Sequence, residues 1–291
     1  METIQRQKIV SVLVVIAVKA LISMLHVNSI GPCGRGSGPC IPAEQWSRHV
    51  RAQDFPGSSP SASPSPLTVA HLVTADLFDS LFPARNFSFY TYVSFLTAAE
   101  AFPDFGTSGG LDSRKQEIAA FVAHIQYETS GLSFIEAGDQ STDYCDVIAN
   151  ASFTCFPGKK YFPRGPMQIT WNYNYGSASD SVGTNILAEP ELVASDAVLS
   201  FKTALWLWMS NSSNKPSCHA VMTGMWTPTS TDVAASRLAG FGTTTNILKG
   251  NEECGHESPE ADSRTKLYLE AATALDVVPG EHLQCSTSLP F

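Results

Sequence analysis

Two carboxyl groups, Glu128 and Glu136, lie eight residues apart and could share one chemical task. The residues before Glu128 repeat with the i, i+3, i+4, i+7 spacing of an amphipathic helix. The apolar members of this repeat are Ile118, Phe121, Val122 and Ile125. Continuing the period places Glu128 on the buried face, at the end of its helix. Burial disfavours the charged form of a carboxyl group, and a carboxyl that keeps its proton near neutral pH can act as a general acid. The alternative is a glutamate that lies in solvent at a helix end, as most glutamates do.

The helix that carries Glu128 has a predicted start at Ser113. Ser113 and Gln116 have the spacing of a capping box, and Asp112 adds negative charge at the positive end of the helix dipole. The sequence therefore predicts a helix that begins at about residue 113 and delivers a carboxyl group at its other end.

A dense polar and aromatic segment, YFPRGPMQITWNYNYG, runs from Tyr161 to Gly176. Aromatic faces stack on sugar rings, and amide and hydroxyl groups can bind sugar hydroxyls. Amides in a buried strand would need partners of their own, so this mixture favours a carbohydrate-binding cleft over a core strand. The alternative is a polar aromatic loop packed on the surface.

Several motifs occur in the same order as in glycoside hydrolase family 19 chitinases, which this chain resembles. They read YETSG at 127–131, DYC at 143–145, CFPGKKY at 155–161, RGPMQITWNYNYG at 164–176, FKTALWLWM at 201–209, KPSCHAV at 215–221, GFG at 240–242 and ECG at 253–255. The resemblance extends from about Leu67 to Cys285. A chance match would be limited to one short motif and would not continue in order over this length. It implies a mainly α-helical, two-lobed, lysozyme-like fold with a substrate cleft between the lobes.

The resemblance also implies roles for individual residues. Enzymes of this family invert the anomeric centre with two carboxyl groups, and by position Glu128 corresponds to the acid and Glu136 to the base. Thr170 corresponds to the residue that positions the attacking water. The spacing of the two glutamates resembles compact, class IV-like members that lack a loop, although the loop around Glu136 is one residue shorter still. The expected substrate-binding residues are Gln168, Tyr173, Asn174, Lys215, Glu253 and Arg264. For the last two, which correspond to a charged pair beside the acid and base, the alternative is an ordinary structural salt bridge.

Some positions differ from the family pattern. Tyr127 replaces the usual histidine before the acid, and Phe162-Pro163 replaces Tyr-Gly. Lys249 stands where an asparagine contacts sugar, and Phe153 replaces a tryptophan. None of these changes removes an acid or a base, so they concern substrate preference and turnover rather than the class of reaction.

Composition and the N-terminal region indicate which partners, which compartment and which domains to expect. The chain has 291 residues and a net charge of −9, and the absence of a basic run argues against a nucleic-acid partner. Residues 1–27 combine basic residues with an apolar run and are interpreted as a cleaved signal peptide, with an uncleaved membrane anchor as the alternative. Residues 28–66 are rich in Ser, Pro and Gly and are predicted to form a disordered linker. The catalytic domain is predicted to span residues 67–291.

The seven cysteines leave at least one thiol unpaired. The resemblance implies disulfides between Cys145 and Cys155 and between Cys254 and Cys285. Cys33 and Cys40 could close a short loop but are too few for a chitin-binding module, which we predict to be absent. Cys218 is expected to be a buried free thiol. None of the cysteines has metal-ligand spacing with the histidines, so neither a metal site nor a cofactor is predicted.

Three sequons, at Asn86, Asn150 and Asn211, fit a secreted glycoprotein. The leading interpretation is therefore a secreted, monomeric endochitinase that binds chitin or its oligosaccharides. A non-catalytic chitinase-like carbohydrate-binding or cell-wall protein is the second hypothesis, and the presence of Glu128 argues against it. Hydrolysis of a related polymer such as peptidoglycan is the third.

Overall fold

The structure is a computed structural model that describes residues 68–291 except 147, 149–151 and 213. The predicted signal segment, the linker, Cys33 and Cys40 lie outside the described residues. Within the described ranges the chain is mainly helical, and backbone pairing of the β type is limited to isolated bridges such as Glu136 with Arg164 and Arg164 with Ile169. This confirms the predicted mainly α fold. From residue 68 onward, none of the helices is both long and apolar enough to cross a membrane.

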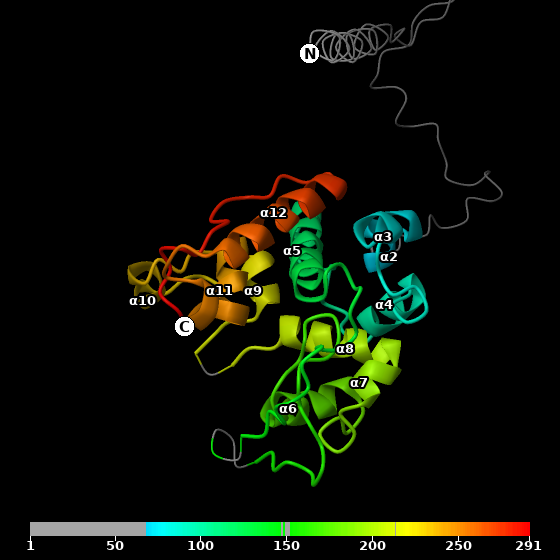
Figure 1. The fold of residues 1–291 in the computed structure, drawn as a ribbon. Coiled ribbons are helices and arrows are strands. Elements are labelled where there is room, and N and C mark those ends of the chain that lie inside the picture. The colour runs from blue at the N-terminus through cyan, green and yellow to red at the C-terminus, as the bar shows by residue number, and fades with distance from the viewer. Residues whose placement is uncertain (1–67, 147, 149–151, 213) are drawn as a thin grey trace, which may run out of the picture. The chain divides into compact units, whose positions relative to one another are not determined.

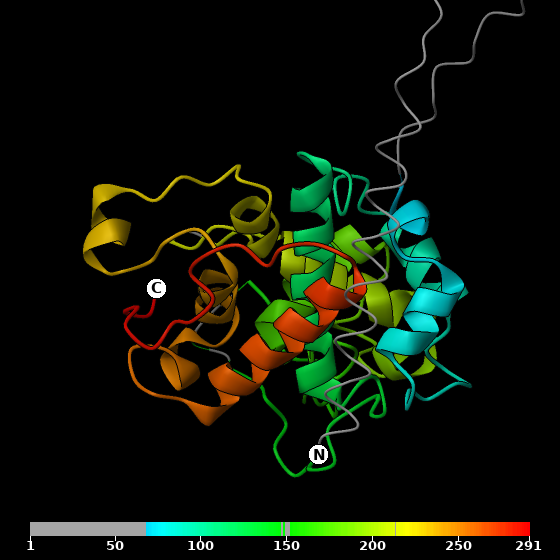
Figure 2. The same ribbon diagram turned by 90° about the horizontal axis from the view of Figure 1, so that it is seen from above.

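The helix that carries Glu128 is α5 (Leu111–Thr129), and it lies at the centre of the molecule. α12 (Pro259–Ala274) packs against it (Figures 1 and 2). The side chains predicted to face inward from α5, at positions 118, 121, 122 and 125, are all buried. The helical period therefore predicts the inward face of α5 correctly along the helix.

The predicted start of α5 is wrong by two residues. The helix begins at Leu111 with Gly110 as its N-cap, and no side chain caps it. Gln116, the expected partner of Ser113 in a capping box, instead donates to the carbonyl of Val278 at 2.8 Å. The Gln116 side chain, which the local sequence assigns to a cap, therefore makes a tertiary contact instead. Asp112 does lie in the first turn, as predicted.

Two hydrophobic clusters build two lobes. The larger one surrounds α5 and includes α3 (Ala75–Leu81), α4 (Tyr92–Ala99) and α12. The smaller one gathers side chains from 161–169, α6 (Asn172–Val182) and α7 (Leu192–Ser195). The remaining helices are α2 (Val69–Leu72), α8 (Ala197–Met209), α9 (Cys218–Met222), α10 (Ser230–Ala234) and α11 (Phe241–Glu253).

α8 links the two clusters. Asp196 caps it by accepting hydrogen bonds from the N–H groups of Val198 and Leu199. Leu199 belongs to the smaller cluster, whereas Phe201 belongs to the larger one. α8 therefore fixes the two lobes against each other.

Both disulfides expected from the resemblance are present, Cys145–Cys155 and Cys254–Cys285, and Cys218 is a buried free thiol as predicted. Burial raises the pKa of Cys218, so it remains a thiol rather than a thiolate.

The sequons remain predictions. Asn86 is partly buried and accepts a hydrogen bond from Ser88 of its own sequon at 2.7 Å. Asn211 is exposed. Asn150 lies outside the described residues.

Candidate active site

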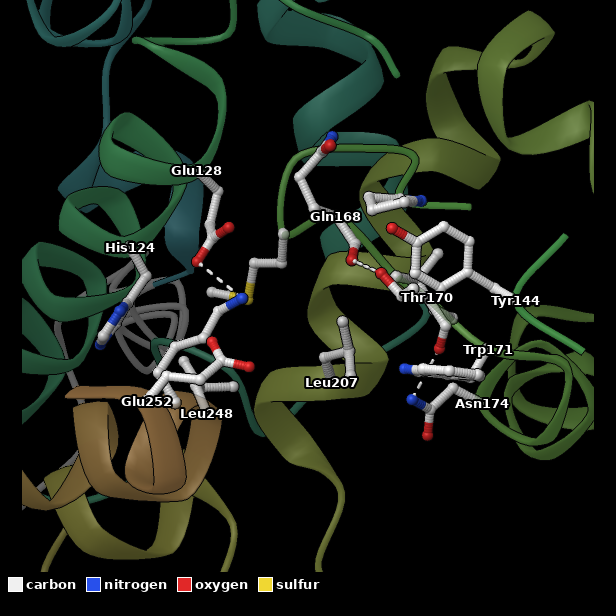
Figure 3. A pocket seen from close by; sticks show the side chains of 14 residues that line it. His124, Glu128, Tyr144, Gln168, Thr170, Trp171, Asn174, Leu207, Leu248 and Glu252 are labelled. Atoms are coloured by element: carbon white, nitrogen blue, oxygen red, sulfur yellow. Dashed lines mark hydrogen bonds and ion pairs between the residues drawn. The ribbon is translucent and has the colours of Figure 1, made fainter. Parts of the chain in front are cut away.

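A hollow of about 460 Å³ lies between the two lobes (Figure 3). Figure 3 shows Glu128, His124 and Glu252 on one side of it and Gln168, Thr170 and Asn174 on the other. The first group comes from α5 and α11, and the second from the polar aromatic segment that sequence composition assigned to a carbohydrate cleft. The complete lining is His124, Glu128, Tyr144, Pro163, Met167, Gln168, Ile169, Thr170, Trp171, Asn174, Leu207, Leu248, Lys249 and Glu252.

Glu128 lies at the end of α5, and its side chain is 13% exposed. Its Oε1 atom accepts a hydrogen bond from Nη2 of Arg264. The ammonium group of Lys249 lies 3.6 Å from the same oxygen. A carboxyl group therefore faces the hollow from a largely buried position, as the helical period predicts, and two cations approach one of its oxygens.

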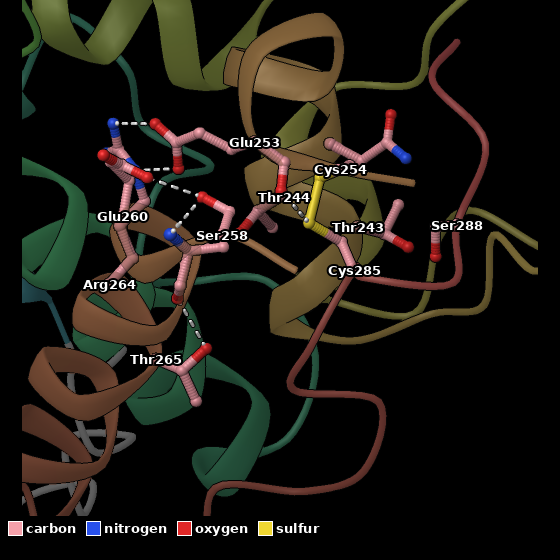
Figure 4. The surroundings of a disulfide bond; sticks show 12 residues. Thr243, Thr244, Glu253, Cys254, Ser258, Glu260, Arg264, Thr265, Cys285 and Ser288 are labelled. Atoms are coloured by element: carbon pink, nitrogen blue, oxygen red, sulfur yellow. Dashed lines mark hydrogen bonds and ion pairs between the residues drawn. A yellow bond between two sulfur atoms is a disulfide. The ribbon is translucent and has the colours of Figure 1, made fainter. Parts of the chain in front are cut away.

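Arg264 joins Glu128 to a second glutamate. Nε and Nη2 of the guanidinium donate to the two carboxylate oxygens of Glu253 at 2.8 and 2.9 Å (Figure 4). Burial opposes the charge of Arg264, but its hydrogen bonds with Glu253 and the nearby charge of Glu128 raise its pKa. Glu253 and Arg264 are therefore in contact with Glu128 and do not form an isolated salt bridge, although neither lines the hollow.

Glu136 is placed differently from Glu128. Its side chain is 39% exposed and does not line the hollow. Oε1 accepts from Nε2 of Gln140 at 2.9 Å, and Oε2 lies 3.6 Å from Nε of Arg164. The bridge between Glu136 and Arg164 holds this segment beside the 161–169 loop. In this conformation the two glutamates do not face one common hollow.

The loop opposite Glu128 carries an ordered set of polar groups. Thr170 donates its hydroxyl proton to the carbonyl of Gln168 at 2.8 Å, and the Asn174 amide donates to the carbonyl of Thr170 at 2.8 Å. Gln168 and Trp171 both have positive φ, at 52° and 76°. Non-glycine residues rarely adopt such angles, and they are held there only by surrounding structure. This wall of the hollow is therefore preorganised.

Two further predicted substrate-binding residues, Tyr173 and Lys215, also lie outside the lining. Tyr173 stacks against Trp171 with ring centroids 6.2 Å apart, so it supports a ring that does line the hollow. Lys215 donates to the carbonyl of Ile247 at 3.2 Å, and burial lowers its pKa.

Apart from apolar side chains, sequence reasoning missed four residues of the lining as site residues: His124, Tyr144, Trp171 and Glu252. His124 precedes Glu128 by one helical turn, so the same period could have found it. Trp171 lies inside the polar aromatic segment. Its ring packs edge-on against the ring of Tyr144, with the ring centroids 5.2 Å apart. Glu252 carries no such local signal. Among the described residues, no three His, Cys, Asp or Glu side chains gather in a way that could hold a metal ion.

Comparison with known proteins agrees with this geometry. The family model described as chitinase class I matches residues 72–285. Chitinase 1 of Oryza sativa subsp. japonica is 44% identical, over 92% of this chain and 88% of its own length. The basic endochitinase of Vitis vinifera is 39% identical, over 93% and 94%.

Solved structures give the same result. A family GH19, class IV chitinase from Zea mays aligns with a TM-score of 0.62 at 36% identity, covering 74% of this chain and 98% of that one. Chitinase C from Streptomyces griseus HUT6037 aligns with a TM-score of 0.65 at 34% identity, covering 74% and 80%. The resemblance read from the sequence motifs is confirmed, as is the fold that it implied.

Proposed function

Since the chain belongs to glycoside hydrolase family 19, the class I chitinase family, we propose that it is an endochitinase. It hydrolyses β-1,4-linked N-acetylglucosamine polymers by an inverting acid–base mechanism. The observation that carries this proposal is Glu128, a largely buried carboxyl group facing a hollow whose opposite wall is lined by Trp171 and by amide and hydroxyl side chains. A purely carbohydrate-binding relative would not need such a carboxyl group.

Glu128 is the proposed acid, which protonates the glycosidic oxygen as the bond breaks. Arg264 donates to Oε1, and Lys249 approaches the same atom. A proton on Oε1 would compete with these cations, so the proton to be transferred belongs on Oε2. Arg264 thus selects which oxygen of Glu128 delivers the proton.

Glu136 is the proposed base, which removes a proton from the attacking water. The base of an inverting enzyme lies about 6.5–9.5 Å from the acid, with the water between them. Glu136 is held by Gln140 and Arg164, so acting on water in the hollow requires it to turn away from these partners when substrate binds. Glu252 is the second candidate, because it is the other carboxyl side chain in the lining.

The acid is tested with chitohexaose and NMR analysis of the product anomers. The wild type should release product with a fresh α-anomer, and Glu128→Gln should release none. Parallel incubation with bacterial peptidoglycan separates a chitinase from a wall hydrolase. Undiminished turnover by Glu128→Gln would exclude the proposed mechanism.

The base is tested by comparing Glu136→Gln with Glu252→Gln. Loss of kcat on the order of 100-fold or more in the first and retention in the second would support Glu136. The reverse result would transfer the role to Glu252, and full activity in both would exclude both residues.

We also propose a secreted, monomeric protein glycosylated at the exposed Asn211. The two disulfides support this setting, because such bonds persist in oxidising compartments. Expression in a secreting eukaryotic cell, followed by glycosidase treatment and intact mass, tests the proposal. Retention of the chain inside the cell without added glycan mass would contradict it.

A further inference from the structure

A histidine that the acid–base pair does not use lies one helical turn before Glu128. His124 is completely buried on α5 and has a hydrogen-bond partner at each ring nitrogen. Nδ1 lies 3.2 Å from Nη1 of Arg264, and Nε2 lies 2.9 Å from the hydroxyl of Thr244 on α11. The ring also stacks against Phe241 with centroids 5.0 Å apart. His124 therefore joins three helices, α5, α11 and α12, directly behind the acid.

Both contacts require the same tautomer. A guanidinium can only donate, so Nδ1 must accept and carries no proton. Thr244 already donates its single hydroxyl proton to the carbonyl of Phe241 at 2.7 Å, so it can only accept from Nε2. The network thus assigns a neutral imidazole with its proton on Nε2.

The electrostatic surroundings agree with a neutral ring. Burial lowers the pKa of His124 well below its usual value, and the charges of Arg264 and Lys249 lower it further. The carboxylates of Glu128 and Glu253 accept hydrogen bonds from Arg264 rather than from His124. His124 is accordingly a fixed acceptor throughout the working range of an acid–base enzyme.

The guanidinium of Arg264 is constrained from every side. Glu253 binds Nε and Nη2, Glu128 binds Nη2, and His124 accepts from Nη1. The ring of Tyr127 covers one face of the guanidinium at 4.1 Å. Without His124, Nη1 of Arg264 would lose its buried acceptor. The guanidinium could then rotate about its bidentate bonds to Glu253 and move away from Glu128.

We propose that His124 is a positioning residue for the reaction: its neutral imidazole holds Arg264 in the orientation that fixes Oε1 of Glu128 and leaves Oε2 to carry the proton. The inference rests on the proposed chitinase function. A misplacement of about 1 Å at a reacting group can cost on the order of 100-fold in rate, so loss of this acceptor should affect turnover more than substrate binding.

The test uses two neighbouring threonines of α11, Thr244 and Thr243, as a matched pair. Figure 4 shows the two side chains near the Cys254–Cys285 disulfide. Both are buried and both donate to a main-chain carbonyl, but only Thr244 bonds to His124. Thr244→Val preserves shape yet removes the acceptor that fixes the proton on Nε2. It should lower kcat on chitohexaose about tenfold or more with little change in KM. Thr244→Ser should restore the rate, and Thr243→Val should leave it near that of the wild type.

Substitution at His124 provides the second arm. His124→Asn keeps an acceptor near the position of Nδ1, whereas His124→Leu does not, so kcat should fall much further in the second. The control is His219→Leu, which removes a buried histidine that bonds Glu117 and does not line the hollow. If His219→Leu and His124→Leu lower kcat equally, the role of His124 is only structural and the proposal is overturned.

NMR decides the proposal independently of activity. The ring ¹⁵N signals of His124 should show one neutral tautomer in the wild type, and the guanidinium protons of Arg264 should exchange with solvent faster in Thr244→Val. Unchanged exchange in that variant, or a protonated ring in the wild type at neutral pH, would overturn the proposal. An inactive wild type that shows the expected NMR signals would instead contradict the chitinase function alone.

Discussion

Thr170 has one hydroxyl proton, which it donates to the carbonyl of Gln168. Its oxygen is therefore available to the hollow only as an acceptor, which suits a group that orients an attacking water by receiving one of the water's protons. Thr170→Val should lower kcat on the order of 10–100-fold by removing this acceptor, whereas Thr170→Ser should retain most of it. Steady-state kinetics on chitohexaose checks this, and equal rates for the two variants would contradict it.

His124 should also appear in the pH dependence of stability. Burial holds the folded-state pKa of His124 well below 6.5, whereas the unfolded chain binds a proton at about that pH. Its contribution to stability is therefore complete above pH 6.5 and is lost progressively at lower pH, by up to about 1.4 kcal/mol per pH unit.

Thermal melts of the wild type and His124→Asn between pH 7.5 and 4.5 measure this contribution. Acidic residues titrate in both proteins, so their effect cancels in the comparison. The Tm of the wild type should decline more steeply below pH 6.5 than that of His124→Asn. Parallel curves would show that His124 is not kept neutral by the fold.

At the residue scale, periodicity predicted the position of Glu128 but not its partners. A 3.6-residue repeat determines which side of α5 faces inward, and it therefore determines the location of one carboxyl group. The contact with Arg264 joins residues 136 positions apart and became an expectation only through the family resemblance. The placement of Glu136 depends on tertiary contacts with Gln140 and Arg164 that no local pattern encodes.

The Cys145–Cys155 disulfide lies directly beside Tyr144, which lines the hollow. Tyr144 precedes Cys145, has a φ of 52° and meets Trp171 edge-on. Replacing both cysteines by alanine should destabilise the protein by about 2–3 kcal/mol, because the disulfide limits the entropy of a short unfolded loop. KM for chitohexaose should also rise, with a smaller effect on kcat.

A double-mutant cycle with Tyr144→Ala identifies the route of this effect. If the disulfide acts on binding through Tyr144, the increase in KM should not add to that of Tyr144→Ala. Full additivity would show that the loop contributes to binding through other residues.

Helix starts follow local capping signals at some places and not at others. α8 begins where Asp196 supplies a local cap, and a cap acts within a few residues of sequence. α5 begins before its capping pattern at Ser113, and Gln116, which that pattern needs, binds the carbonyl of Val278 instead. Local signals therefore predict element ends well where no distant segment competes for the capping side chain.

On the scale of the whole molecule, α5 carries two glutamates with different roles. Glu117 has a structural role and Glu128 is the proposed catalytic acid. Glu117 lies about three turns before Glu128, on the same side of α5, and is completely buried. It accepts hydrogen bonds from Nε1 of Trp208 at 3.0 Å and from the main chain of Gly106 at 2.9 Å, and it lies 2.6 Å from Nδ1 of His219. These contacts tie α5 to α8, α9 and the loop before α5, and thus to the helix shared by both lobes.

The two glutamates should therefore respond in opposite ways to the same substitution. Glu117→Gln weakens charge-assisted hydrogen bonds in the core and should cost about 2–3 kcal/mol, which lowers Tm on the order of 5–10 °C. Its kcat well below the melting range should be near that of the wild type. Glu128→Gln should abolish turnover while shifting Tm much less, since Arg264 keeps its bidentate partner Glu253. Calorimetry and kinetics on both proteins test this separation. A Glu117→Gln enzyme that folds normally at 25 °C but cannot turn over would mean that the core network also controls the hollow.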